Sequence, residues 1–82
     1  MAFEKQDTAQ KIVAIIADEL KVDKNIIKQD ATFESLGADS LDMVQIVMRL
    51  EEQFGLEIND ADAEKMTNLN DVINYIHERR TK

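Results

Sequence analysis

The sequence predicts an all-α fold: a four-helix bundle with three main helices, one short helix and a long loop between the first two. Apolar residues recur at steps of three and four in three segments, which is the period of one helix face. No segment alternates convincingly with period two, as a half-buried strand does, and the chain contains no proline. We expect residues 1–82 to form a single domain.

The first helix is predicted to run to Leu20. Either Asp7 or Thr8 is expected to be its N-cap, because such side chains accept a hydrogen bond from a free N–H group at a helix start. The apolar stripe that follows consists of Ala9, Ile12, Val13, Ile16 and Leu20.

The segment 21–39 loses this period and is expected to be a long loop, with one helical turn near residues 25–28. Connections of this length are uncommon in small domains unless they have a function or are held by their own packing. The side chains expected to hold the loop are Val22, Ile26, Ile27, Phe33 and Leu36.

The second helix is predicted to start after Gly37, with Asp39 or Ser40 as its N-cap. Gly55 is expected to end it, because glycine adopts the left-handed conformation that commonly follows a helix. Its inward stripe contains Met43, Ile46, Val47, Leu50 and Phe54.

A short third helix is expected from Asn59 or Asp60 through Met66. Asn68, with Asp71 three residues later, resembles a reciprocal capping pattern and is expected to open the fourth helix. The apolar face of that helix consists of Leu69, Val72, Ile73 and Ile76. We expect the charged tail 78–82 to fray, and His77 to be a surface residue near the helix end.

The charge of the chain excludes several classes of partner. Ten basic and seventeen acidic residues give a net charge of -7, which repels nucleic acid and anionic membranes and favours partners with basic patches. The longest apolar run, Ile12–Ala17, is far shorter than the roughly 20 residues that span a bilayer. The start of the chain lacks the pattern of a signal peptide. We therefore expect a monomeric cytoplasmic protein.

The residue types also argue against a metal site. The chain has no cysteine and a single histidine, so neither a disulfide nor a zinc site is expected. The acidic segment 60–71 faintly resembles a calcium loop, but Lys65 replaces its required glycine and Asp71 its bidentate glutamate. No metal is assigned.

Ser40 stands where the long loop meets the second helix, and it allows two interpretations. In the first, Ser40 is only an N-cap, and Asp39 and Asp42 are first-turn acids that suit the helix dipole. In the second, a phosphate ester on Ser40 lies at the helix start, where free N–H groups favour an anion. A catalytic nucleophile would need a nearby base, and the G-x-S-x-G elbow of hydrolases is absent. We therefore do not expect an enzyme.

The second helix carries more apolar residues than one stripe needs. Leu41, Val44 and Met48 share a second face. Its polar flank consists of Asp42, Gln45, Glu51 and Glu52. This face either packs on the third helix or the long loop, or it forms a docking surface whose acids steer basic partners.

The segment Gly37-Ala38-Asp39-Ser40-Leu41-Asp42 resembles the phosphopantetheine attachment segment of bacterial and organellar acyl carrier proteins. The similarity continues through residues 47–54, 57–65 and 75–76, and so covers nearly the whole chain. It implies a single acyl carrier domain of the type II fatty-acid-synthesis kind. It also implies that a phosphopantetheinyl transferase moves phosphopantetheine from coenzyme A onto Ser40, reading Asp39 and Leu41.

The resemblance further implies that the arm holds acyl chains as thioesters, and that the second face docks fatty acid synthesis enzymes through their basic patches. Related carriers often have an acid in place of Gln45 and a small residue in place of Arg49, so partner preferences are expected to differ.

Apolar residues between the helices are candidates to hold the acyl chain, although ordinary core is the stronger interpretation for each of them taken singly. They are Ile46, Val47, Leu50, Phe54, Ile58 and Ile73. Two other functions stay open. One is a carrier of polyketide, aryl or aminoacyl cargo. Ala38 and Asp42, beside Asp39-Ser40-Leu41, resemble the fatty-acid type more than these carriers. The other is an acidic interaction module in which Ser40 is never modified.

Overall fold

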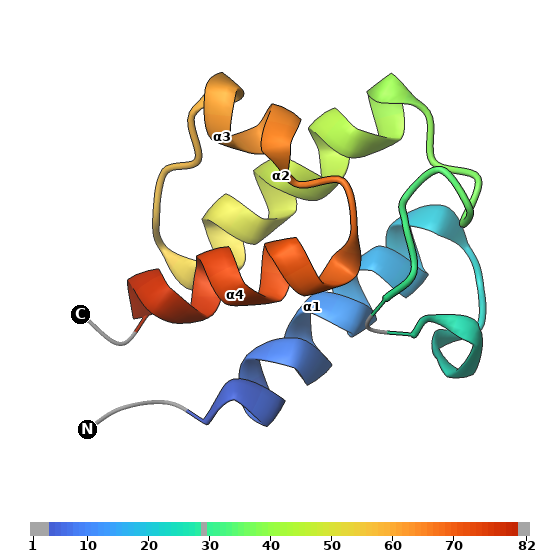
Figure 1. Ribbon diagram of the computed structural model, residues 1–82, viewed down its shortest axis with the longest axis horizontal. Coiled ribbons are helices and arrows are strands. Elements are labelled where there is room, and N and C mark those ends of the chain that lie inside the picture. The colour runs from blue at the N-terminus through green and yellow to red at the C-terminus, as the bar shows by residue number, and fades with distance from the viewer. Residues whose placement is uncertain (1–3, 29, 81–82) are drawn as a thin grey trace.

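The computed structural model describes residues 4–28 and 30–80, which form four α-helices and one 3₁₀ turn. The elements are α1 (Lys5–Leu20), η1 (Lys24–Ile26), α2 (Ser40–Phe54), α3 (Asp60–Lys65) and α4 (Leu69–Arg80). Helix α1 packs against both α2 and α4, and the short α3 lies apart from α1 in the view of Figure 1. The predicted all-α fold is confirmed. None of the described helices is long and apolar enough to cross a membrane.

The core is built from the apolar stripes of the three long helices. Its fully buried side chains include Ile12, Ile16, Ile46, Leu50, Leu69, Val72, Ile73 and Ile76. The predicted face of α4 is buried in full, which confirms its 3.6-residue period. In α1, Ile15 is buried in addition to the predicted stripe, whereas Val13 and Leu20 are only partly buried.

The predicted N-cap of the first helix is wrong. Helix α1 begins at Lys5, and the preceding Glu4 has an extended backbone and makes no capping hydrogen bond with its side chain. Asp7 lies in the first turn, and Thr8 is fully buried. Both side chains are good caps by type, but here they bind residues from the far end of the chain.

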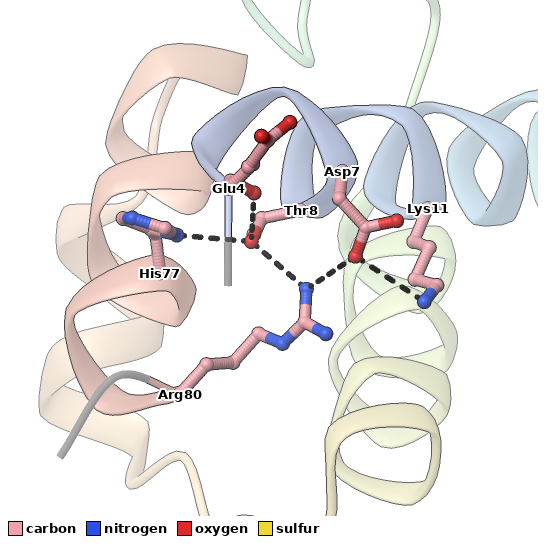
Figure 2. A network of polar contacts seen from close by, with 6 residues as sticks. All are labelled: Glu4, Asp7, Thr8, Lys11, His77 and Arg80. Atoms are coloured by element: carbon pink, nitrogen blue, oxygen red, sulfur yellow. Dashed lines mark hydrogen bonds and ion pairs between the residues drawn. The ribbon is translucent and has the colours of Figure 1, made fainter. Parts of the chain in front are cut away.

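A polar network joins the start of α1 to the end of α4 (Figure 2). The Arg80 guanidinium donates hydrogen bonds to the Thr8 hydroxyl at 2.9 Å and to the Asp7 carboxylate at 3.2 Å. The same hydroxyl lies 3.0 Å from Nδ1 of His77. Lys11 completes the network with a 3.3 Å ion pair to Asp7. The network holds the last turn of α4 on α1.

This network corrects two expectations about the charged tail. Residues 78–80 remain helical, and the Arg80 side chain is only 8% exposed, so the tail does not fray as far as Arg80. Residues 81 and 82 lie outside the described part of the chain. His77 is half-buried against α1, so it is only partly the surface residue that was expected.

The long loop is held by packing, as expected, but not by every predicted side chain. Ile27 and Phe33 are buried, and Val22 and Leu36 pack partly against the core. Ile26 instead points into solvent from η1 and is largely exposed. The 3₁₀ turn starts one residue earlier than predicted, because the Asp23 side chain caps it at the N–H group of Asn25.

A backbone contact that the sequence did not indicate also anchors the loop. Thr32 pairs with Asn68 in an isolated antiparallel bridge. The N–H group of Phe33 donates to the Thr67 carbonyl at 3.1 Å, and that of Leu69 donates to the Ala31 carbonyl at 2.9 Å. The middle of the loop is therefore tied to the connection between α3 and α4.

Two helices end on a residue in the left-handed conformation. Gly55 follows α2 with φ of 64°, which confirms the predicted end of that helix. Lys21 follows α1 with φ of 56° and ψ of 45°. Such angles suit glycine better than a residue with a Cβ atom, so α1 ends under local strain.

Candidate functional site

The start of α2 is closed by two aspartates that cap each other's backbone. The Asp39 carboxylate accepts a hydrogen bond of 2.8 Å from the N–H group of Asp42. The Asp42 carboxylate accepts one of 3.1 Å from the N–H group of Asp39. This is a complete capping box, with Asp39 as the N-cap. The interpretation of Ser40 as the cap is therefore wrong.

Ser40 is the first residue of α2, and its side chain is exposed. Within the described residues its hydroxyl makes no hydrogen bond, and the N–H groups of Ser40 and Leu41 likewise have no partner there. Free N–H groups at the positive end of a helix favour an anion. A phosphate ester on this hydroxyl therefore fits the site without breaking any contact of the fold.

A groove of about 770 Å³ lies between α2, α3 and the end of the long loop, and Ser40 is part of its lining. Its apolar lining consists of Phe33, Ala38, Met43, Val44, Val47, Met48, Ile58, Ala63 and Met66. Acidic side chains, among them Glu34, Asp60 and Glu64, also line it. The groove thus offers an apolar surface with polar edges beside the exposed serine.

Only part of the predicted acyl pocket lines this groove. Val47 and Ile58 do so. Phe54 is partly buried beneath the Arg80 guanidinium, whose central carbon lies 4.9 Å from the ring centroid. Three of the other predicted residues lie in the closed core: Ile46, Leu50 and Ile73.

The sequence did not single out several groove residues. The sequence predicts Met43 only as part of the inward stripe of the second helix, and it indicates no role for Ala63 or Met66. Ala63 and Met66 are three residues apart, a spacing that indicates a shared helix face. The helix α3, however, is only six residues long. So short an element does not display a recognisable stripe.

The second face of α2 is exposed. Leu41, Val44 and Met48 are 67%, 54% and 56% exposed, respectively. The alternative that this face packs on the third helix or the loop is therefore excluded for these side chains. Val44 and Met48 also form part of the groove, so the apolar surface is continuous from the face into the groove.

The polar residues that flank this face differ in exposure and in hydrogen bonding. Gln45 and Glu52 are exposed, whereas Asp42 is engaged in the capping box. The Glu51 carboxylate accepts a hydrogen bond of 2.9 Å from the N–H group of Ile58. Glu51 thereby fixes the connection from α2 to α3, a structural role that the sequence did not indicate.

Comparison with known proteins identifies the family. A family model described as "Phosphopantetheine attachment site" matches residues 10–76. An acyl carrier protein from Rubrobacter xylanophilus is 44% identical over 80 residues, which cover 96% of this chain and 99% of the relative. The chain belongs to the acyl carrier protein family. Acyl carrier proteins are carriers rather than enzymes, and their covalently bound prosthetic group is phosphopantetheine.

Family membership confirms the resemblance seen in the sequence. For this acyl carrier protein it establishes acyl chains as cargo and enzymes as the partners that act on them. The chemistry of the cargo belongs to the prosthetic group and to those enzymes, while the protein supplies the point of attachment.

Proposed function

We propose that this acyl carrier protein carries growing fatty acyl chains as thioesters on a phosphopantetheine arm attached to Ser40, and delivers them to fatty acid synthesis enzymes. The observation that carries the proposal is the state of Ser40. Its hydroxyl is exposed at the start of α2 while Asp39 makes the cap, so modification disturbs no contact. The thiol of the arm supplies the thioester chemistry.

Recognition of the carrier is assigned to the surface around Ser40. Asp39 and the exposed Leu41 flank the serine, and we expect a phosphopantetheinyl transferase to recognise them. Fatty acid synthesis enzymes dock on the second face of α2 through basic patches, which the net charge of -7 attracts. The docking residues are Asp42, Val44, Gln45, Met48, Glu51 and Glu52.

The groove is the proposed shelter of the acyl chain. Val47 and Ile58 line it together with Ser40. A longer chain reaches Ile46, Leu50, Phe54 and Ile73 only if the helices part. Each buried methylene gains about 0.8 kcal/mol. A partner enzyme must offset this gain when it extracts the chain, so sequestration competes with delivery.

Attachment is tested by intact-protein mass spectrometry after incubation with coenzyme A, magnesium and a broad-specificity phosphopantetheinyl transferase. The wild type is expected to gain one phosphopantetheine group, and Ser40→Ala none. Ser35→Ala is the matched control, because Ser35 is also exposed and lies in the loop before the site. It is expected to react like the wild type. If the folded wild type gains no mass, the chain is an acidic interaction module and the proposal is wrong.

The cargo is tested with saturated acyl thioesters of graded length on the modified protein. Transfer to a small free thiol is expected to slow as the chain lengthens, because more methylenes are buried. Ala63→Phe fills the groove and is expected to remove this dependence, while Ala14→Phe on the exposed side of α1 leaves it intact. A rate that does not vary with length in the wild type contradicts shelter of a fatty chain and favours another cargo.

A further inference from the structure

Arg49 of α2 is bound to two acids of α1. Its guanidinium lies 2.8 Å from the Asp18 carboxylate and 3.4 Å from the Glu19 carboxylate. The hydrogen bond to Asp18 raises the pKa of Arg49 above its ordinary value, so the group stays cationic. Asp18 is 75% exposed and Arg49 is 37% exposed, so the contact is formed at the surface. It spans the seam between α1 and α2.

This contact borders the second face of α2. Arg49 follows Met48 and lines a shallow hollow of about 480 Å³ together with Met48, Gln45 and Glu52. Asp18 and Glu19, the α1 acids next to this hollow, are therefore already bound by a cation of the chain itself. At the α3 edge the situation differs, because Asp60 and Glu64 have no ion-pair partner among the described residues.

We infer that Arg49 is a selectivity residue that withholds Asp18 and Glu19 from basic partner enzymes. The inference rests on the proposed function, since it concerns docking on the same face. A lysine or arginine of a partner can bind Asp18 or Glu19 only after it displaces Arg49 from these acids. Partners whose basic patch matches the α3 edge meet free acids instead. Selectivity between partners then has two sources. Contact with the α1 edge is disfavoured, and contact with the free acids of the α3 edge is favoured.

The test uses Ser40 modification by a basic phosphopantetheinyl transferase, with kcat and KM measured over a range of salt concentrations. Arg49→Ala is expected to lower KM about two- to fivefold at low salt, the range of an exposed charge pair, with kcat unchanged. The difference is expected to vanish at high salt, where such charges are screened. Arg49→Lys keeps the cation and is expected to stay close to the wild type.

A triple variant distinguishes two causes of a lower KM in Arg49→Ala. One is that Asp18 and Glu19 become free to bind the partner, and the other is that a cation which repels the partner is lost. Adding Asp18→Asn and Glu19→Gln to Arg49→Ala is expected to return KM to the wild-type value or above it. If the lower KM persists in this triple variant, Arg49 acts by direct repulsion and the inference is wrong. It is also wrong if Arg49→Ala leaves KM unchanged while Ser40 is modified normally. Absence of modification in the folded wild type would instead contradict the proposed function.

Discussion

Tyr75 of α4 donates a hydrogen bond of 2.8 Å from its hydroxyl to the carboxylate of Asp62 on α3. The Arg79 guanidinium lies over the same ring, 3.7 Å from its centroid, and 3.7 Å from the same carboxylate oxygen. Helix α3 has no buried residue of its own and only Ala63 packed partly against the core, so these contacts add to what holds it to α4. Since α3 forms one wall of the groove, they also hold the groove at its observed width.

Loss of the Tyr75 hydroxyl is expected to loosen α3. Tyr75→Phe keeps the ring under Arg79 but removes the hydrogen bond, and the free energy of unfolding should fall by about 1 kcal/mol. Amide hydrogens of α3 should exchange faster, while those of α1 should change little. Urea unfolding and hydrogen–deuterium exchange measure the two effects.

Asp62→Asn and Asp60→Asn make a matched pair for the same contact. Both change an acid to an amide on α3, but only Asp62 binds Tyr75 and Arg79. Faster exchange of α3 is expected in the first variant only, and equal behaviour of the two variants contradicts the role given to Asp62.

The hydrogen bond from Tyr75 to Asp62 is expected to be lost at alkaline pH. Burial, and then the hydrogen bond to Asp62, raise the pKa of Tyr75 above its ordinary value of 10.0. Because the folded pKa is the higher one, the stabilisation is complete below the unfolded pKa and is lost as pH rises through the folded pKa. Tyr75 is the only tyrosine and the chain has no tryptophan, so tyrosinate absorbance reports this residue alone. Its titration midpoint should be higher in the native protein than in the urea-unfolded chain. A native midpoint at or below the unfolded one contradicts the prediction.

The network at the start of α1 should weaken in acid. The hydrogen bond from Lys11, and to a smaller extent the one from Arg80, lower the pKa of Asp7 below its ordinary value of 3.8. Since the folded pKa is the lower one, the stabilisation is present above the unfolded pKa and is lost as pH falls through the folded pKa. Asp7→Asn should therefore be less stable than the wild type near neutral pH, and the difference should shrink below the ordinary pKa.

Thermal unfolding across this pH range measures the Asp7 effect. Asp30→Asn is its control, because Asp30 is exposed in the loop and has no ion pair among the described residues. A difference between Asp7→Asn and the wild type that stays constant down to the most acidic pH would show that charge is not the cause.

The left-handed end of α1 offers a stabilising substitution. Lys21 is exposed at φ of 56°, where a residue with a Cβ atom is strained by roughly 1 kcal/mol. Lys21→Gly is expected to raise the free energy of unfolding by up to about this amount. Gly55→Ala places a Cβ atom in the same conformation at the end of α2 and should lower it by a similar amount. Urea unfolding of both variants should give changes of opposite sign.

Local patterns were sufficient to predict the long helices, because a helix that buries one face repeats its apolar residues every three or four positions. The buried face of α4 is an example. The ends of the bundle were not predictable in this way. Thr8 has the chemistry of an N-cap, and nothing near it indicates that it binds Arg80, which is 72 residues away along the chain. Contacts of this kind depend on how α1 and α4 are placed in space.

The site was predictable to a similar extent. The motif located Ser40 at the start of a helix, but it could not decide which residue makes the cap, because aspartate and serine cap equally well. Periodicity also could not separate Val47, which faces the groove, from Ile46, which faces the closed core. Both lie on the inward side of α2, and only the position of α3 distinguishes them.

The capping box of Asp39 and Asp42 makes the start of α2 independent of the Ser40 side chain. Since these two residues close the start of α2 between themselves, the helix has the same ends whether Ser40 is a bare hydroxyl or bears a substituent. A newly synthesised chain can therefore fold first and be stored in that form. In the proposed function, the arm is then attached to a chain that is already folded, and its attachment leaves the capping contacts in place.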